Sequence, residues 1–150
     1  VEYGYYHGYT LFDKQKKQPR YPFGFGLSYT NFSISNINTS TKQLTQNDTI
    51  QIKFSVKNIG NRTGAEVIQL YIGFQNTNVD MPEKLLRAFT KIELNPTEQK
   101  STTLSVPVKD LAWYNTDTKA WQVDSGKYLI LIGNSSQNTQ LQRTTIEVNN

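Results

Sequence analysis

The sequence lacks cysteine altogether and has a single histidine, His7, among its 150 residues. Without cysteine, disulfides, thiolate nucleophiles and zinc–thiolate sites are excluded, and one imidazole offers no pair of ligands for a metal ion. No apolar run reaches about 18 residues, so no segment is expected to span a membrane. We therefore expect a chain with no metal site, no cofactor and no membrane span.

An excess of one charge is also lacking, because 16 basic and 12 acidic residues leave a net charge of only +4. Proteins that bind nucleic acids concentrate basic residues on one face. Here the basic cluster, Lys14 to Arg20, lies in a glutamine-rich stretch, and the other basic residues are interleaved with acids. We interpret the cluster as a solvated loop and expect no nucleic-acid partner.

Aromatic residues, by contrast, are abundant and unevenly distributed. Nine of the 18 lie in the first 30 residues, together with four of the nine glycines. A self-contained domain does not usually divide its core in this way, so the segment is expected to pack against something outside itself. Because the first residue is Val1 rather than methionine, we also expect the chain to be a piece excised from a longer protein.

From residue 31 onward the hydrophobic pattern has the period of β-strands. Ile50 to Lys57 alternates apolar and polar residues, which is typical of a strand with one face in the core. Residues 66–74 contain a higher density of apolar residues, several of them β-branched, as expected of a central strand. The predicted strands number about seven and cover residues 32–37, 50–57, 66–74, 85–94, 102–108, 127–133 and 140–148.

Turn residues separate these strands, at Asn58 to Gly64, Asn95 to Thr97 and Asp124 to Gly126. No segment keeps a 3.6-residue period over three turns, so little helix is expected. The pattern predicts an all-β fold, an immunoglobulin-like or fibronectin type III-like sandwich of antiparallel strands, and the missing cysteine pair favours the second. We assign residues 31–150 to this sandwich and residues 1–30 to an irregular N-terminal extension.

Within the extension, Tyr21 to Tyr29 cannot form a helix because one proline and two glycines interrupt it. An extended conformation would place five apolar side chains on one side, those of Tyr21, Phe23, Phe25, Leu27 and Tyr29. An apolar strip with glycines that permit close backbone approach is typical of a segment laid across another surface. The rest of the extension is too short to supply that surface.

Candidate catalytic residues are few. His7 is the side chain expected to titrate near neutral pH, but the sequence fixes no serine, aspartate or second histidine beside it. Ser28 lacks the Gly-x-Ser-x-Gly context of a nucleophile elbow. Paired carboxylates could hydrolyse glycosides, yet the acids lie mostly on predicted turns or polar strand faces: Asp80, Glu83, Glu93, Glu98, Asp110, Asp117 and Asp124. We expect solvated roles for them and assign no catalytic residue.

Trp113 and Trp121 flank a polar, hairpin-like stretch from Tyr114 to Ala120. Exposed tryptophan and tyrosine rings can stack on sugars, so Trp113, Tyr114 and Trp121 form a candidate carbohydrate platform. The alternative is that these rings pack over one end of the sandwich. Five Asn-x-Ser/Thr sequons favour an extracytoplasmic location, periplasmic or secreted, and they begin at Asn31, Asn38, Asn47, Asn61 and Asn134.

Several motifs resemble one known family. Tyr21 to Phe32 (YPFGFGLSYTNF) is similar to the segment that joins the catalytic part of family-3 glycoside hydrolases, such as β-glucosidases and β-xylosidases, to their C-terminal fibronectin type III-like domain. Further motifs of the family are matched in order by His7 to Asp13, Val56 to Ile72, Pro82 to Phe89, Trp121 to Tyr128 and Ile132 to Ser136. The chain departs from the family at three positions, with Thr10 in place of the usual arginine, and Ala88 and Thr97 where glycine is common.

The resemblance implies a non-catalytic accessory domain. In the family, the nucleophilic aspartate and the acid/base glutamate lie in domains that would precede Val1, and the parent would be a retaining β-glucosidase-like enzyme. The resemblance implies that residues 31–150 pack against and stabilise the catalytic domains of the same polypeptide and shape one side of the active-site entrance. Residues 1–30 would be the tail of the catalytic part and the interdomain linker. The expected contact residues are Tyr9, Phe12, Tyr21, Phe23, Phe25 and Tyr29.

Two other functions stay open. The chain could be a carbohydrate-binding module that tethers the enzyme to polymeric substrate, or it could hydrolyse glycosides alone. Without the catalytic part, residues 1–30 are expected to be loosely ordered, to fold onto their own sandwich, or to bury themselves in a neighbouring molecule.

Overall fold

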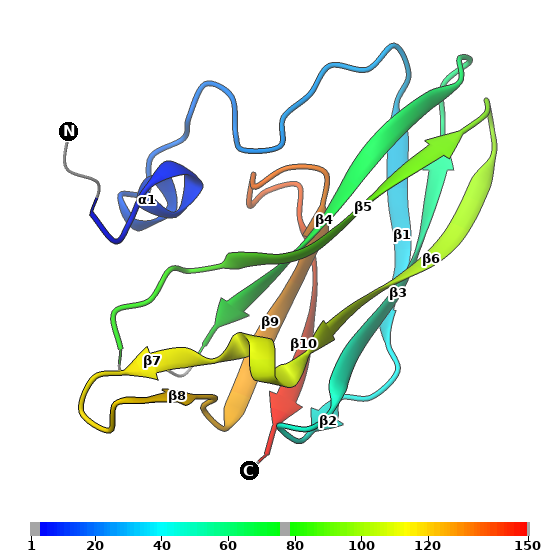
Figure 1. Cartoon of the computed structure of the whole chain (residues 1–150). Coiled ribbons are helices and arrows are strands. Elements are labelled where there is room, and N and C mark those ends of the chain that lie inside the picture. Colours follow the sequence, from blue (N-terminus) through cyan, green and yellow to red (C-terminus); the bar gives the residue numbers. More distant parts are fainter. Residues whose placement is uncertain (1–3, 76–78, 150) are drawn as a thin grey trace.

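The structure of the chain is a computed structural model that describes residues 4–75 and 79–149. Two packed β-sheets form its body, and a helix and a two-stranded hairpin are attached at one end (Figure 1). The elements, in chain order, are α1 (Gly8–Lys14), β1 (Phe32–Thr39), β2 (Gln43–Leu44), β3 (Thr49–Asn58), β4 (Gly64–Phe74), β5 (Leu85–Leu94), β6 (Gln99–Pro107), the 3₁₀-helix η1 (Val108–Leu111), β7 (Trp113–Asn115), β8 (Ala120–Gln122), β9 (Gly126–Gly133) and β10 (Gln142–Val148).

The predicted all-β sandwich is confirmed. One sheet has the strand order β1-β3-β6 and the other β2-β10-β9-β4-β5. The pairs are antiparallel except for the short parallel pair of β2 with β10. All seven predicted strands are present as β1, β3, β4, β5, β6, β9 and β10, and the predicted hairpin-like stretch is the β7–β8 hairpin. The pattern did not predict β2, η1 or α1.

The core lies between the two sheets. Ser55 of β3 is only 5% exposed and departs from the predicted alternation. The rest of residues 50–57 alternates as predicted, with Gln51, Lys53 and Lys57 exposed and Ile50, Ile52, Phe54 and Val56 buried. These side chains belong to one cluster with residues of β4, β6 and β9. Burying a side chain of this size contributes about 1.5–3 kcal/mol, so the alternating face of β3 is one main source of the stability of the sandwich.

Strand β4 is buried on both of its faces, which explains its dense apolar sequence. Ile68, Leu70 and Ile72 face the core between the sheets. Gln69 and Tyr71 point to the outer side and are nevertheless buried, 4% and 0% exposed. Tyr71 forms a second apolar cluster with Leu131 and Leu141, against which Tyr9 of α1 packs. The N-terminal extension therefore covers part of the outer face of the five-stranded sheet.

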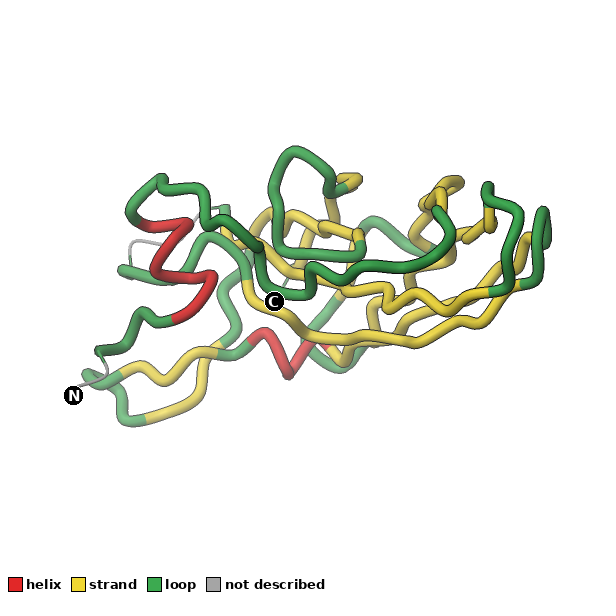
Figure 2. The backbone as a smooth tube through the Cα atoms, turned by 90° about the horizontal axis from the view of Figure 1, so that it is seen from above, coloured by secondary structure: helices red, strands yellow, loops and turns green. Residues whose placement is uncertain are grey.

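The extension folds onto its own sandwich, one of its three expected behaviours, over the described residues 4–30. Helix α1 has seven residues, too few to be stable in isolation, so it depends on contacts with the sheet. Helix α1 and the β7–β8 hairpin lie at the same end of the molecule, on the left in both Figure 1 and Figure 2. Within the described ranges, no helix is long and apolar enough to cross a membrane.

Candidate functional site

The linker between α1 and β1 is hydrogen-bonded to the β9–β10 loop at Phe23 and lies close to β4 of the five-stranded sheet at Gly24. The carbonyl oxygen of Phe23 accepts a hydrogen bond from the backbone N–H of Ser136 at 2.8 Å. Gly24 has a φ of +82°, and a Cβ atom there would lie 2.0 Å from Nε2 of Gln69. The predicted close approach is thus real, but the surface is the chain's own sheet. The expectation that this surface is missing from the chain is corrected at these two residues.

Tyr9 attaches α1 to the same sheet. Its ring lies 5.6 Å from the ring of Tyr71 and 5.4 Å from that of Phe23, and its hydroxyl accepts a hydrogen bond from the backbone N–H of Leu86 at 3.0 Å. Burial raises the pKa of the Tyr9 hydroxyl above its usual value. The sequence assigned Tyr9 to an interdomain contact, whereas in this structure its ring and hydroxyl are used inside the chain.

A buried ion pair makes the second attachment of α1. Lys84, 1% exposed, places Nζ 2.6 Å from Oδ2 of Asp13 and 2.9 Å from Oδ1 of Asn138. Burial lowers the pKa of the Lys84 amine, against the opposing effect of Asp13. A buried charge is tolerated only when it is paired and hydrogen-bonded, so Lys84 requires α1 in place. Sequence reasoning missed this pair, since its members are 71 residues apart.

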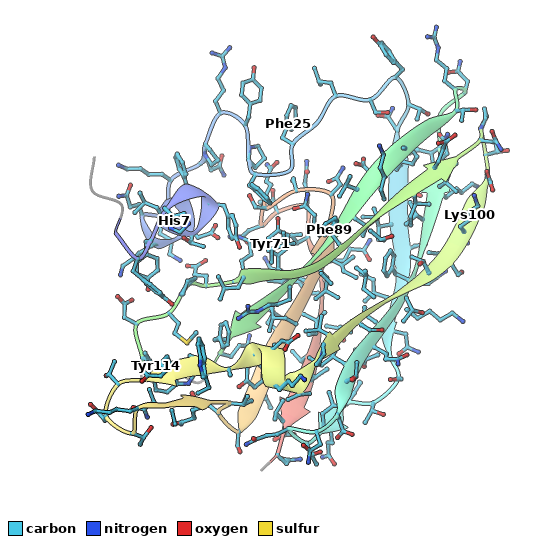
Figure 3. All side chains as sticks on the ribbon, in the orientation of Figure 1. His7, Phe25, Tyr71, Phe89, Lys100 and Tyr114 are labelled. Carbon is cyan, nitrogen blue, oxygen red and sulfur yellow. The ribbon has the colours of Figure 1, made fainter. Side chains whose placement is uncertain are left out.

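The remaining part of the linker exposes apolar side chains. Tyr21 is 62% exposed, Leu27 93% and Tyr29 90%, and Phe25 packs beside Tyr21 with ring centroids 5.3 Å apart. We call Tyr21, Phe25, Leu27 and Tyr29 the apolar strip. Figure 3 shows Phe25 on the linker, apart from the two sheets. Large exposed apolar side chains that gather on one segment indicate an interaction site.

A cleft of about 470 Å³ continues this surface between the linker and α1. Phe12 and Phe25 contribute apolar walls, while Lys17 and Arg20 contribute positive charge. Of the six expected contact residues, Phe12, Tyr21, Phe25 and Tyr29 are thus available to a partner. Tyr9 is half-buried in the chain, and Phe23 is held by its backbone while half of its side chain stays exposed.

The C-terminal end of the linker is fixed by Asn58, a residue that sequence reasoning included in a motif without assigning it a role. Asn58 is fully buried, and its Oδ1 accepts hydrogen bonds from the Thr30 hydroxyl at 2.6 Å and from the Gly60 N–H at 3.0 Å. Its Nδ2 donates to the carbonyl oxygens of Arg62 and Leu94. One side chain therefore joins the linker, the β3–β4 turn and the end of β5.

The β7–β8 hairpin divides the predicted carbohydrate platform between two faces. Tyr114 is paired with Trp121, and Trp113 is paired with Gln122. Since neighbouring residues of a strand point to opposite sides, Tyr114 and Trp121 share one face and Trp113 lies on the other. The Tyr114 and Trp121 rings meet edge-to-face at 5.6 Å, and Trp121 is 72% exposed.

Hydrogen bonds order the polar residues of the hairpin. Oδ2 of Asp124 accepts from the Trp113 indole N–H at 2.8 Å, and its Oδ1 accepts from Nε2 of Gln122 at 2.6 Å. Oε1 of Gln122 accepts from Nδ2 of Asn115 at 3.0 Å. An open cleft of about 700 Å³ runs along these residues, with Trp113 and Trp121 among its walls. This volume is within the range of about 300–1,000 Å³ that small-molecule sites occupy.

The other sequence candidates have structural partners. His7 precedes α1, and Thr10, which replaces the usual arginine of the family, uses its hydroxyl to accept from the His7 N–H and to donate to the His7 carbonyl. The Ser28 hydroxyl accepts from the Thr30 N–H at 3.4 Å.

Several of the candidate carboxylates are likewise paired. Asp80 accepts from Lys14 and Tyr6, Glu83 pairs with Lys16, and Glu98 pairs with Lys100. Over residues 4–75 and 79–149, no three His, Cys, Asp or Glu side chains gather as a metal site would require.

Comparison with known proteins gives one consistent picture. Residues 66–136 match the sequence profile of the fibronectin type III-like domain family. The thermostable beta-glucosidase B of Acetivibrio thermocellus is 42% identical over 146 residues, which cover 96% of this chain and 19% of that protein. A putative beta-xylosidase of Formosa agariphila is 38% identical over 136 residues, 90% of this chain and 17% of that protein. The chain thus spans about a fifth of the length of these curated relatives.

Solved structures that superpose on this chain are also beta-glucosidases. Beta-glucosidase 3B from Thermotoga neapolitana, solved in complex with α-D-glucose, superposes with a TM-score of 0.84 at 36% identity over 95% of this chain and 19% of its own length. The GH3 beta-glucosidase of Bifidobacterium adolescentis superposes with a TM-score of 0.85 at 28% identity over 94% of this chain and 20% of its own. Nearly the whole chain, extension included, is therefore matched within longer proteins.

Proposed function

This chain belongs to the fibronectin type III-like domain family, and from that premise we propose that it is a non-catalytic accessory domain of a β-glucosidase-like glycoside hydrolase. Its proposed work is to dock onto the catalytic domains of the same polypeptide and to stabilise them. The proposal is supported by relatives that are beta-glucosidases or a putative beta-xylosidase and of which the chain spans about a fifth.

The apolar strip is the observation that carries this proposal. The linker is hydrogen-bonded to the sandwich at Phe23 and again at Thr30, and between these points Leu27 and Tyr29 are almost fully exposed. Because the backbone is already held at both ends, docking costs less conformational entropy than it would for a free segment. The partner that fits is an apolar surface of the catalytic part, which lies in the four-fifths of the relatives outside this match.

The test compares the isolated chain with the longer enzyme. Replacing Leu27 and Tyr29 by serine is expected to lower the melting temperature of the longer enzyme by several degrees. The same replacements should leave the melting temperature of the isolated chain unchanged, because neither side chain is buried in it. An equal effect on both proteins, or no effect on either, would contradict the docking role.

The hydrolytic chemistry is proposed for the parent alone. Two carboxylates of the preceding domains would cleave β-glucosides with retention, and the docked sandwich would shape one side of the entrance to that site. Turnover of an aryl β-glucoside by the purified 150-residue chain above a buffer blank would overturn this division of roles.

An extracytoplasmic location is part of the same proposal. Asn31, Asn38, Asn47 and Asn61 are exposed at the starts of their sequons, whereas Asn134 is half-buried and donates to Glu66. Four of the five sequons are therefore open to modification in the folded chain. Fractionation of the source cells should recover the parent outside the cytoplasm, and recovery in the cytoplasm would refute the location.

A further inference from the structure

The cleft between α1 and the linker has features that the exposed apolar strip does not explain by itself. We call it the helix–linker cleft. Its volume is about 470 Å³, and its lining residues come mainly from α1 and the turn after it, from the linker, and from the loop between β9 and β10 (Figure 1). Volumes of about 300–1,000 Å³ are typical of sites that hold a small molecule. The cleft is therefore large enough for a few side chains of a docked segment.

Backbone hydrogen bonds fix the helical wall of the cleft. At the end of α1 the Lys17 N–H donates to the Phe12 carbonyl, and the Lys16 N–H donates to the Asp13 carbonyl, each at 3.0 Å. Lys16 has a φ of +54°. This arrangement is the Schellman motif, and it holds the Lys17 backbone beside the last turn of the helix.

The linker wall is fixed in a similar way. The Phe25 N–H donates to the Pro22 carbonyl at 2.9 Å, which closes a tight turn, and the Phe23 carbonyl within that turn accepts from the Ser136 N–H at 2.8 Å. Pro22, Phe25 and Ser136 all line the cleft. Because both walls are already formed, a partner that enters the cleft orders little of this chain and binds at a lower cost in conformational entropy.

The cleft also carries positive charge that this chain does not neutralise. Lys17 and Arg20 line it, and both are exposed. Over residues 4–75 and 79–149, neither of them forms an ion pair. The two acids that line the cleft are each paired with another lysine, Asp13 with Lys84 and Glu83 with Lys16. Complementary charge at interfaces favours a partner that brings carboxylates to Lys17 and Arg20.

From this geometry we infer that the helix–linker cleft receives an acidic segment of the catalytic part of the same polypeptide, in which an apolar side chain is next to a carboxylate. The apolar side chain packs on Phe12 and Phe25, which are 38% and 48% exposed. The carboxylate pairs with Lys17 or with Arg20, whose guanidinium can bind it through two hydrogen bonds. This inference rests on the proposed docking function and adds the chemistry of the docked partner.

The position of the cleft favours a segment of the polypeptide over a free small molecule. Phe25 belongs both to the cleft and to the apolar strip, so the cleft continues the surface that is proposed to dock. This chain spans only 19% of the thermostable beta-glucosidase B to which it is similar, which leaves ample polypeptide to supply the segment. A small carboxylated sugar such as glucuronate is the alternative ligand, and the test separates the two.

The test compares the longer enzyme with the isolated chain. Replacing Lys17 and Arg20 together by glutamate should lower the melting temperature of the longer enzyme by several degrees at low salt, because repulsion replaces attraction. The loss should shrink at about 1 M NaCl, where the screening length falls to about 3 Å. The isolated chain should keep its melting temperature, since neither side chain is paired in it.

A chemical measurement locates the contact directly. When both proteins are treated with an amine-acetylating reagent and analysed by mass spectrometry, Lys17 should react readily in the isolated chain and several-fold more slowly in the longer enzyme. The matched control for the charge reversal is Lys53→Glu combined with Lys57→Glu, because both lysines are exposed on β3 and the net charge changes by the same amount. This pair of replacements should leave both melting temperatures unchanged.

Several results would overturn the inference. They are an equal loss of melting temperature in the isolated chain, an equal loss from the Lys53 and Lys57 replacements, a loss that high salt does not reduce, and equal acetylation of Lys17 in both proteins. Saturable binding of glucuronate by the isolated chain, without any effect of the charge reversal on the longer enzyme, would assign the cleft to a small molecule instead.

Replacement of Leu27 and Tyr29 by serine, measured in parallel, separates this inference from the docking function. If those replacements destabilise the longer enzyme and the charge reversal does not, the docking function stands and the acidic segment is refuted. If neither set of replacements has an effect, both proposals fail.

Discussion

At the scale of single residues, Thr97 occupies a turn position that suits glycine. Asn95 to Glu98 form a β-turn in which the Glu98 N–H donates to the Asn95 carbonyl at 3.1 Å, with Pro96 second. Thr97 stands third with a φ of +65°. A turn with proline second and a positive φ third is of type II, and a β-branched residue is strained there. This explains why glycine is common at the position in the family that the chain resembles.

Thr97→Gly is therefore expected to stabilise the chain. Removing the Cβ atom from a residue in the left-handed conformation should raise the free energy of unfolding by about 1–2 kcal/mol. The greater conformational freedom of glycine in the unfolded chain should lower it by about 0.4–1 kcal/mol. The net gain of about 1 kcal/mol should appear in urea unfolding as a higher midpoint with an unchanged slope. A lower midpoint would show that the turn is not strained.

Asn58→Ala is expected to destabilise the chain by about 2–3 kcal/mol, because the Thr30 hydroxyl, the Gly60 N–H and two carbonyl groups would lose a buried partner. Asn61→Ala, at an exposed position of the same turn, is the control and should change the free energy of unfolding by less than about 0.5 kcal/mol. Equal effects of the two variants in urea unfolding would refute the assigned role.

At the scale of elements, α1 exists because the sheet holds it. A seven-residue helix is unstable alone, and α1 is attached through Tyr9 and through the Asp13–Lys84 ion pair. Both attachments join residues that are distant in the sequence. The helix should therefore be lost when the ion pair is broken, while the sandwich remains folded and the linker keeps its own hydrogen bonds at Phe23 and Thr30.

Lys84→Met tests this dependence. It leaves the Asp13 carboxylate without its cation in a poorly hydrated place, which should detach α1. In hydrogen exchange, the amides of Gln15 and Lys17, which donate to carbonyls of α1, should lose most of their protection, while β3 keeps its own.

The matched control is Lys16→Met, which breaks the exposed pair with Glu83 and should change little. Combining Lys84→Met with Asp13→Leu should restore protection, since an apolar pair can replace a buried ion pair. Retention of α1 protection in Lys84→Met alone would contradict the assigned role of the pair.

At the scale of the whole molecule, two buried tyrosines, Tyr71 and Tyr128, are expected to lower the free energy of unfolding at alkaline pH. Burial raises the pKa of Tyr128 to about 12 and raises that of Tyr71 as well. Between pH 10, where tyrosines of the unfolded chain ionise, and the higher pKa of the folded state, the folded chain binds more protons. The free energy of unfolding therefore decreases with pH in this window.

The expected slope is about 1.4 kcal/mol per pH unit for each such group. Lys84, whose pKa is lowered by burial, acts in the opposite direction below about pH 10.5, where the unfolded chain binds the extra proton. Urea unfolding from pH 8 to 11.5 should thus show a decline that steepens above pH 10.5. Tyr128→Phe should flatten that decline, and an unchanged slope would contradict the assignment.

Local periodicity was enough to predict the seven principal strands, because the hydrophobic pattern of a strand shows which of its faces are buried. β3 alternates because one face packs in the core, and β4 is apolar along most of its length because both faces are covered. The sequence also placed a turn before β9 and predicted a close approach at the linker glycines, which the structure shows at Gly24 and not at Gly26. Both features depend on the conformation of a few neighbouring residues, whereas Thr97 stood out through the resemblance to the family. Motif order was enough to indicate the family.

Tertiary structure alone decided how the extension is used. Tyr9 is turned inward because Tyr71, 62 positions later, lies beneath it, and Asp13 is buried because Lys84 is opposite. The division of Trp113 from Tyr114 and Trp121 depends on the register of the hairpin. The sequence alone determined the strands and the number of apolar side chains in the linker. Contacts between distant residues, whose free energy no local pattern records, decided which aromatic rings hold the chain together and which are left for a partner.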